Sequence, residues 1–135
     1  MFHVNLNSLD AHLDDLHATL DLLGFPFQVI GVSETRENVK MNNALHGYNL
    51  HSQPSSSAAG GVALYTSKSL NAVKRTDLSV SNEEFETVWV EIKNIKSKNI
   101  LCCCAYRNPS PPERFTEHIE TVLHNLVREK RIYLY

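Results

Sequence analysis

An amphipathic helix followed directly by a long apolar segment is the feature that most restricts the fold of this chain. Leucines recur at helical spacing from Leu9 to Leu23, with aspartates mostly on the opposite face and Gly24 at the position of a C-cap. The segment Phe25 to Ser33 is then almost continuously apolar, which is typical of a strand covered on both faces. A helix that leads into such a strand indicates an α/β fold.

The middle of the sequence predicts a long polar loop and then a series of strands. The loop runs from about Thr35 to Gly60, and within it only the segment "GYNLH" resembles a short strand. Four segments rich in β-branched and aromatic residues follow, at residues 60–67, 70–76, 85–92 and 98–106. Because short turns separate them, we expect these strands to pair in antiparallel fashion.

A second helix is predicted after a proline-rich break. Ser110 with Glu113 forms a capping box, and Pro111 occupies the first helical position. The apolar face continues to Leu126 and the helix ends in the basic segment "REKR", which is favourable at a helix C-terminus. The last four residues, "IYLY", again have the composition of a buried strand.

Length and composition predict a single domain over residues 1–135. The net charge of -2 and the pI near 6.4 lack the basic excess of proteins that bind nucleic acid mainly by counterion release. No apolar run approaches the roughly 20 residues of a membrane-spanning helix, and no basic start of a secretory signal is present. We therefore expect an intracellular, reducing compartment and no membrane partner. A core strand that begins at Ile132 also predicts that the domain is truncated at its C-terminus.

The residue types that most often bind metals form no recognisable motif. Cys102–Cys104 are consecutive on a predicted strand, so their side chains alternate between two faces and are expected to fill the core. The pairs His12 and His17, and His118 and His124, do not have the spacing that puts two ligands on one helix face. Neither a phosphate-binding glycine loop nor a nucleophile motif is present.

Three residues at predicted strand ends are candidates for a site. The carboxylate of Glu34 follows a buried strand, which suits a hard divalent cation that keeps most of its water. Asn5 lies where a short strand passes into the first helix, and Tyr106 precedes Arg107, whose guanidinium matches phosphate oxygens. From the residues alone, ordinary roles are the more common explanation of each: a turn at Glu34, helix initiation near Asn5, and a tyrosine at the rim of the sheet.

Taken in order, the segments "HVNLNSL", "LHATL", "FPFQVIGVSET", "GGVALYTSKSL", "FETVWVEI" and "CAYRNPSPP" resemble the endonuclease/exonuclease/phosphatase family. Within it, they are most similar to the endonuclease domains of LINE-type (non-LTR) retrotransposons. The resemblance covers almost the whole chain and depends on the order and spacing of the segments. It implies the N-terminal portion of a two-sheet α/β sandwich with helices on the outer faces.

The resemblance also implies a site and a reaction. Glu34, in "SET", corresponds to the metal-binding glutamate, Asn5 to an active-site asparagine, and Tyr106 to a tyrosine that contacts the scissile phosphate. The implied cofactor is Mg²⁺, with Mn²⁺ as the alternative, and the implied reaction is hydrolysis of DNA phosphodiester bonds. Such a domain would be continuous with a reverse transcriptase and would act in the cytoplasm or nucleus.

The sequence departs from the family pattern in ways that limit these expectations. Arg36 and Glu37 follow "SET" where apolar or aromatic residues are usual, and "YRNP" replaces "YRPP". The Gly-Asp-Phe-Asn and Ser-Asp-His motifs, which would supply further site residues and the general base, are absent. We therefore expect little or no catalysis from these residues alone. Two alternatives stay open: a non-catalytic binding remnant, and a family member that acts on a phosphoester other than nucleic acid.

Overall fold

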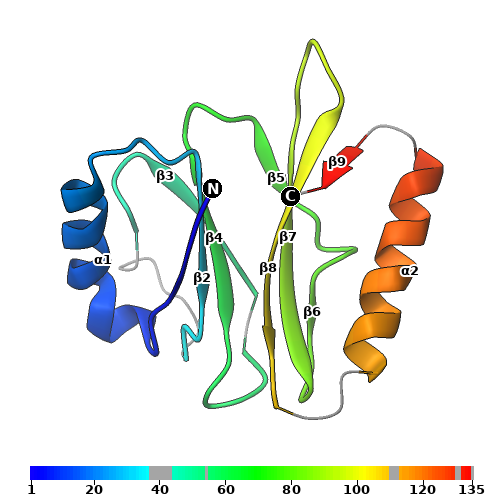
Figure 1. Ribbon diagram of the computed structural model, residues 1–135, viewed down its shortest axis with the longest axis horizontal. Coiled ribbons are helices and arrows are strands. Elements are labelled where there is room, and N and C mark those ends of the chain that lie inside the picture. Colours follow the sequence, from blue (N-terminus) through cyan, green and yellow to red (C-terminus); the bar gives the residue numbers. More distant parts are fainter. Residues whose placement is uncertain (37–43, 54, 110–112, 130–131, 135) are drawn as a thin grey trace.

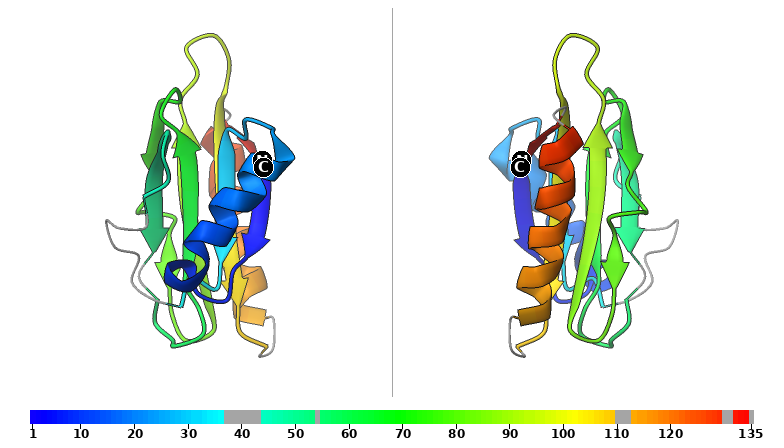
Figure 2. Two further views of the ribbon diagram at one scale, coloured as in Figure 1. Left: turned by 90° about the vertical axis from the view of Figure 1, so that its left-hand side faces the viewer. Right: turned by 90° about the vertical axis from the view of Figure 1, so that its right-hand side faces the viewer.

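Two facing β-sheets lie between two helices in the computed structural model of the chain (Figures 1 and 2). The structure describes residues 1–36, 44–53, 55–109, 113–129 and 132–134. Helix α1 (Leu9–Leu23) covers the outer face of one sheet, and α2 (Glu113–Glu129) covers that of the other. The α/β class and the two-sheet sandwich expected from the sequence are confirmed.

The first sheet has the strand order β1-β2-β4-β3. Its strands are β1 (Phe2–Asn5), β2 (Val29–Ser33), β3 (Tyr48–Gln53) and β4 (Val62–Ser67). β1 and β2 are parallel and are joined through α1, whereas the other pairs are antiparallel. As predicted, β2 is buried along its whole length. It begins later than the apolar segment because Phe25 is exposed and Pro26 has no N–H to donate to a sheet.

The second sheet has the strand order β5-β7-β8-β9, and β6 pairs separately with β7. Its strands are β5 (Ala72–Lys74), β6 (Val80–Ser81), β7 (Phe85–Ile92), β8 (Asn99–Arg107) and β9 (Ile132–Leu134). β7 and β8 form the predicted antiparallel hairpin, and β9 is parallel to β8. The strand expected over residues 70–76 is shorter because the backbone turns at Arg75, whose carbonyl accepts from the N–H groups of Leu78 and Ser79.

Three apolar layers form the core, and strand alternation decides which residues enter each layer. The layer between the sheets contains Val29, Val62, Leu64, Val88, Val90, Ile92, Cys102 and Cys104. The layer under α1 includes Leu9, Leu16, Ile30, Val32, Ala63 and Tyr65, and the layer under α2 includes Leu78, Trp89, Leu101, Val122 and Leu126. The core-filling role expected for the cysteines is confirmed. Ser110 and Pro111 of the expected capping box lie outside the described residues.

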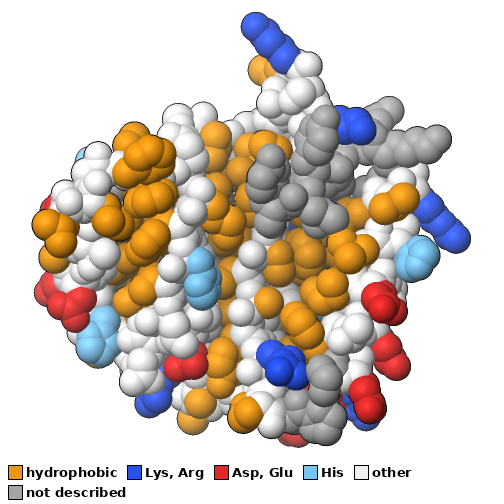
Figure 3. Space-filling model, in the orientation of Figure 1, with side chains coloured by type: hydrophobic (Ala, Val, Ile, Leu, Met, Phe, Trp, Pro, Cys, Tyr) orange, Lys and Arg blue, Asp and Glu red, His pale blue; other side chains and the backbone are white. Residues whose placement is uncertain are grey.

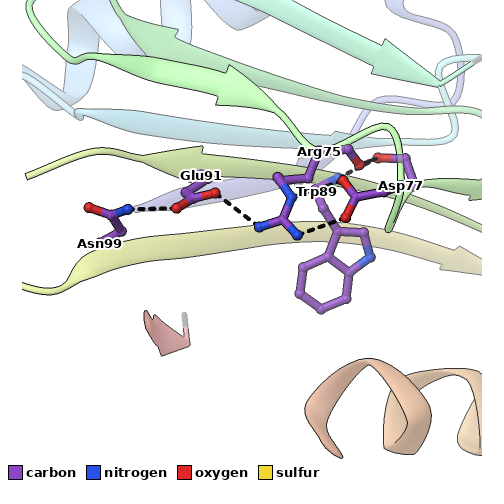
Figure 4. A network of polar contacts seen from close by, with 6 residues as sticks. Arg75, Asp77, Trp89, Glu91 and Asn99 are labelled. Atoms are coloured by element: carbon purple, nitrogen blue, oxygen red, sulfur yellow. Dashed lines mark hydrogen bonds and ion pairs between the residues drawn. The ribbon is translucent and has the colours of Figure 1, made fainter. Parts of the chain in front are cut away.

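A polar network lies on the outer face of the second sheet (Figure 4). The Arg75 guanidinium donates to both carboxylate oxygens of Asp77 at 2.7 and 2.8 Å, and to Glu91 at 2.9 Å. The side chain of Asn99 donates to the other oxygen of Glu91 at 2.6 Å. Hydrogen bonding between Arg75 and Asp77 raises the pKa of the guanidinium and lowers the pKa of the carboxyl. The network fixes the turn after β5 against β7 and the start of β8.

The edge strands β1 and β9 lie on the same side of the sandwich (Figure 2). Hydrophobic side chains gather on this side, between the two helices (Figure 3). In the same orientation, β1, β2 and β8 end at the lower edge of the molecule, where β4 and β7 begin (Figure 1). In the part of the chain that the structure describes, no helix is long and apolar enough to cross a membrane.

Candidate functional site

The structure brings Asn5 and Glu34 together where β1 and β2 end, and these strand ends lie toward the lower edge of the sandwich in Figure 1. Asn5 is the last residue of β1 and pairs with Ser33, the last residue of β2, so Glu34 follows immediately beside it. Both strands run in the same direction, and carboxyl ends of parallel strands meet at one sheet edge. The two residues that the sequence assigned to separate strand ends are therefore neighbours.

Tyr106 reaches the same edge from the second sheet. The thiol of Cys104 donates to the carbonyl oxygen of Val32 at 3.4 Å, so β8 and β2 approach each other closely just before they end. Two residues further along β8, on the same face as Cys104, lies Tyr106, whose side chain packs against the core between the sheets. The sandwich thus presents Tyr106 at the edge that also holds Glu34.

Glu34 has a backbone conformation that is uncommon for a residue with a side chain. Its φ is 55°, in the left-handed region, and the φ of Arg36 is 61°. Asn7 and Ser8, in the adjacent loop between β1 and α1, have φ values of 52° and 122°. All four non-glycine residues with positive φ in the described ranges thus belong to this edge. Such conformations cost about 1–3 kcal/mol each and persist where surrounding contacts hold them.

The segment Glu34–Arg36 is held from two sides by backbone hydrogen bonds. On one side, the N–H groups of Ser8 and Leu9 donate to its first two carbonyl oxygens at 2.8 and 3.1 Å. On the other side, its last two N–H groups donate to the carbonyl oxygens of Gly61 and Gly60 at 3.2 and 2.8 Å. The backbone of Glu34 is therefore fixed between the start of α1 and the start of β4.

The side chains at this edge provide oxygen ligands of the kind that hard cations prefer. The Glu34 carboxylate is half-buried and has no hydrogen-bond or ion-pair partner among the described residues. Asn5 is exposed, and its Oδ1 accepts from the N–H of Asn7 at 3.2 Å. The described residues contain no group of three or more His, Cys, Asp or Glu side chains that could hold a metal. A half-buried carboxylate without a protein partner is the type of ligand through which a cation such as Mg²⁺, which keeps most of its waters, would bind.

Tyr106 and Arg107 do not face the same side. The hydroxyl of Tyr106 donates to Oδ1 of Asn108 at 3.3 Å, and the N–H of Asn108 donates to the carbonyl of Glu84 at 2.9 Å. Strand alternation directs Arg107, which is exposed, to the opposite face of β8. The joint contact of a phenol and a guanidinium with one phosphate, considered from the sequence, is therefore not supported by the strand geometry.

Glu86, the second residue of β7, was not identified from the sequence as part of this region. Its side chain is 1% exposed, and it pairs with Tyr106 across the β7–β8 hairpin, so both share the inner face. The N–H of Ser56 donates to its Oε1 at 2.9 Å, the N–H of Gly61 donates to its Oε2, and the hydroxyl of Ser55 lies 2.9 Å from Oε1. An acid on the apolar face of a predicted strand is the signal that could have revealed it.

Comparisons with known proteins support the fold. No protein-family model and no curated protein sequence matches the chain. The endonuclease domain of TRAS1, a telomere-specific non-LTR retrotransposon, superimposes with a TM-score of 0.64 at 17% identity, covering 98% of this chain and 55% of that one. The AP endonuclease LMAP from Leishmania major superimposes with a TM-score of 0.61 at 16% identity, covering 90% of this chain and 44% of that one. This chain spans about half the length of these structures and has their two-sheet α/β fold.

Proposed function

We propose that this chain, which has the fold of two endonucleases, carries the metal-binding part of a Mg²⁺-dependent DNA phosphodiesterase of the retrotransposon type. One observation carries the proposal. Asn5 ends β1, Glu34 directly follows the end of β2, and Tyr106 lies near the end of β8, so residues from both sheets meet at one edge of the sandwich. An oxygen ligand, an amide and a phenol at one edge are the groups needed to hold a cation and a phosphate.

Each of the three side chains has a role that suits its chemistry. The carboxylate of Glu34 holds the divalent cation, Mg²⁺ or Mn²⁺, which when bound polarises the phosphoryl group and stabilises the leaving oxygen. The amide of Asn5 donates to a phosphate oxygen and orients it. The hydroxyl of Tyr106, which is now directed to Asn108, donates to a second phosphate oxygen.

None of these groups acts as a general base. Loss of general acid–base catalysis typically lowers a rate by about 10² to 10⁴-fold. We therefore expect this chain by itself to bind the cation and to cleave DNA slowly, if at all. A measurement of metal binding therefore tests the site more directly than a measurement of DNA cleavage.

The test uses Mn²⁺ as a paramagnetic probe of the 135-residue chain. At substoichiometric Mn²⁺ we expect selective broadening of the NMR amide signals of residues 34–36 and 5–8, which surround the Glu34 carboxylate. Glu34→Gln keeps the size of the side chain but removes its charge, and should abolish the broadening. Broadening that persists unchanged in Glu34→Gln contradicts the proposal.

Three further measurements separate the nuclease from the two alternatives. Mg²⁺-dependent nicking of supercoiled DNA that is greater for the wild type than for Glu34→Gln supports the nuclease. Metal-independent binding of a DNA duplex, equal in both proteins, favours a non-catalytic binding remnant. Release of phosphate from a phosphomonoester, lost in Glu34→Gln and without nicking, favours a different phosphoester substrate.

A further inference from the structure

The buried carboxylate of Glu86 has no part in the roles proposed above, although it lies at the same edge of the sandwich. Both of its oxygens accept backbone N–H groups from one loop segment, residues 55–61, which precedes β4 of the other sheet, through Ser56 and Gly61. A carboxylate that is 1% exposed needs such partners, because burial of an unpaired charge is very unfavourable. Hydrogen bonds to an ionised acceptor are also about twice as strong as neutral ones. Glu86 therefore fixes this segment against the second sheet.

The segment that Glu86 fixes is the one that holds the backbone next to Glu34. Gly61 donates its N–H to Glu86, and its carbonyl oxygen accepts from the N–H of Thr35 at 3.2 Å. The carbonyl oxygen of Gly60 accepts from the N–H of Arg36 at 2.8 Å. Two successive hydrogen bonds thus connect the buried carboxylate with the residue that follows Glu34.

The packing around the two glycines makes this connection tight. A Cβ atom at Gly60 would lie 2.8 Å from both carboxylate oxygens of Glu86. A Cβ atom at Gly61 would lie 2.1 Å from Oγ1 of Thr35. There is no space for a side chain between Glu86 and Gly60, or between Gly61 and Thr35. A displacement of the Glu86 carboxylate should therefore also move the backbone at Thr35.

We propose that Glu86 is a positioning residue for the metal site. Through Gly60 and Gly61, it holds Glu34 in the left-handed backbone conformation that presents its carboxylate to a divalent cation. This inference rests on the proposed metal-binding role of Glu34. Glu86 is bound by the 55–61 segment and does not itself contact the cation. Loss of an outer partner of a metal ligand typically lowers metal affinity by about 10 to 100-fold, and we expect the same here.

The experiment measures the dissociation constant for Mn²⁺ from the EPR signal of the free ion, using the whole 135-residue chain. Glu86→Gln keeps the shape of the side chain but replaces one acceptor oxygen with an NH₂ group that opposes a backbone N–H. We expect Mn²⁺ binding at least about tenfold weaker than in the wild type. The NMR signals of residues 34–36 should also broaden less at equal Mn²⁺ concentration.

Glu91→Gln is the matched control. Glu91 lies on the same strand but on the outer face, where it accepts from Arg75 at 2.9 Å and from Asn99 at 2.6 Å (Figure 4). Its neutralisation should lower the melting temperature without weakening Mn²⁺ binding. Equal losses of Mn²⁺ affinity in Glu86→Gln and Glu91→Gln would show a general effect of stability, and would overturn the positioning role.

The failure of this inference is distinguishable from the failure of the proposed function. If Glu34→Gln binds Mn²⁺ as the wild type does, the metal site itself is wrong. If Glu34→Gln loses binding while Glu86→Gln keeps it, only the positioning role is wrong. Should Glu86→Gln not fold, the double variant S55A/S56A removes the two hydroxyls that donate to Oε1, at 2.9 and 3.3 Å, and leaves the carboxylate. It should weaken Mn²⁺ binding by roughly 2 to 10-fold, and unchanged binding overturns the inference.

Discussion

The start of β4 is where one added methyl group tests the contacts around Glu34 most directly. Gly61 has a φ of 100°, in a region that costs a residue with a side chain about 1–2 kcal/mol. In Gly61→Ala, the new Cβ would also lie 2.1 Å from Oγ1 of Thr35, whose side chain is buried and has little room to move. Overpacking of this kind typically costs about 1–3 kcal/mol. We therefore expect Gly61→Ala to lower the free energy of unfolding by about 2–5 kcal/mol.

Gly47→Ala separates the two causes of this loss. Gly47 has a φ of 84°, but no atom lies within 4 Å of the Cβ that alanine would add. Gly47→Ala should therefore lower the free energy of unfolding only by the cost of the backbone conformation, about 1–2 kcal/mol. The assay is urea denaturation of the wild type and both variants, with equal m-values as the check that their unfolded states are comparable. A loss in Gly61→Ala no greater than that in Gly47→Ala would refute the contact between Gly61 and Thr35.

Two further predictions concern titratable groups whose pKa is shifted by burial. Burial raises the pKa of Cys104 from the ordinary 9.0 to about 12, so at pH 8 the Cys104 thiol should react with a thiol reagent roughly a thousandfold more slowly in the folded chain than in the unfolded chain. Rapid labelling of Cys104 in folded protein would contradict this. Burial, together with the charge of Lys74, lowers the pKa of His51 below 6.5. The resulting stability is present above pH 6.5 and is lost as the pH falls through the lowered value. His51→Gln should therefore show a shallower loss of unfolding free energy on acidification, and an equal slope would contradict the assignment.

The elements that could be predicted from the sequence are those specified by local patterns. The helix Leu9–Leu23 and the strand Phe85–Ile92 have the expected bounds, because each has a clear hydrophobic period and a clear terminator. The hydroxyl of Ser8 caps the start of this helix and accepts from the N–H of Ala11 at 3.4 Å. β6 was not predicted, since two residues are too few to display a strand period and its pairing with β7 depends on distant residues.

The candidate site was predicted in part for the same reason. Local sequence indicated that Glu34 ends a buried strand, and the parallel pairing of β1 and β2 then brings Asn5 beside it. The positive φ of Glu34 and the contacts that hold it come from residues far along the chain, above all Gly61 and Glu86. Such long-range backbone contacts leave no periodic pattern in the sequence.

The energies at this edge explain why Glu86 matters for a site with one carboxylate ligand. Two left-handed residues, Glu34 and Arg36, cost about 2–6 kcal/mol together. The four backbone hydrogen bonds that hold this segment contribute a similar net amount, about 2–6 kcal/mol. Because these amounts nearly cancel, the ordered conformation depends on a further contribution. The two bonds that the N–H groups of Ser56 and Gly61 donate to the Glu86 carboxylate contribute about 1.5–3 kcal/mol each and fix the 55–61 segment in place. Without that charge, the Glu34 backbone should relax, and a single mobile carboxylate should bind the cation only weakly.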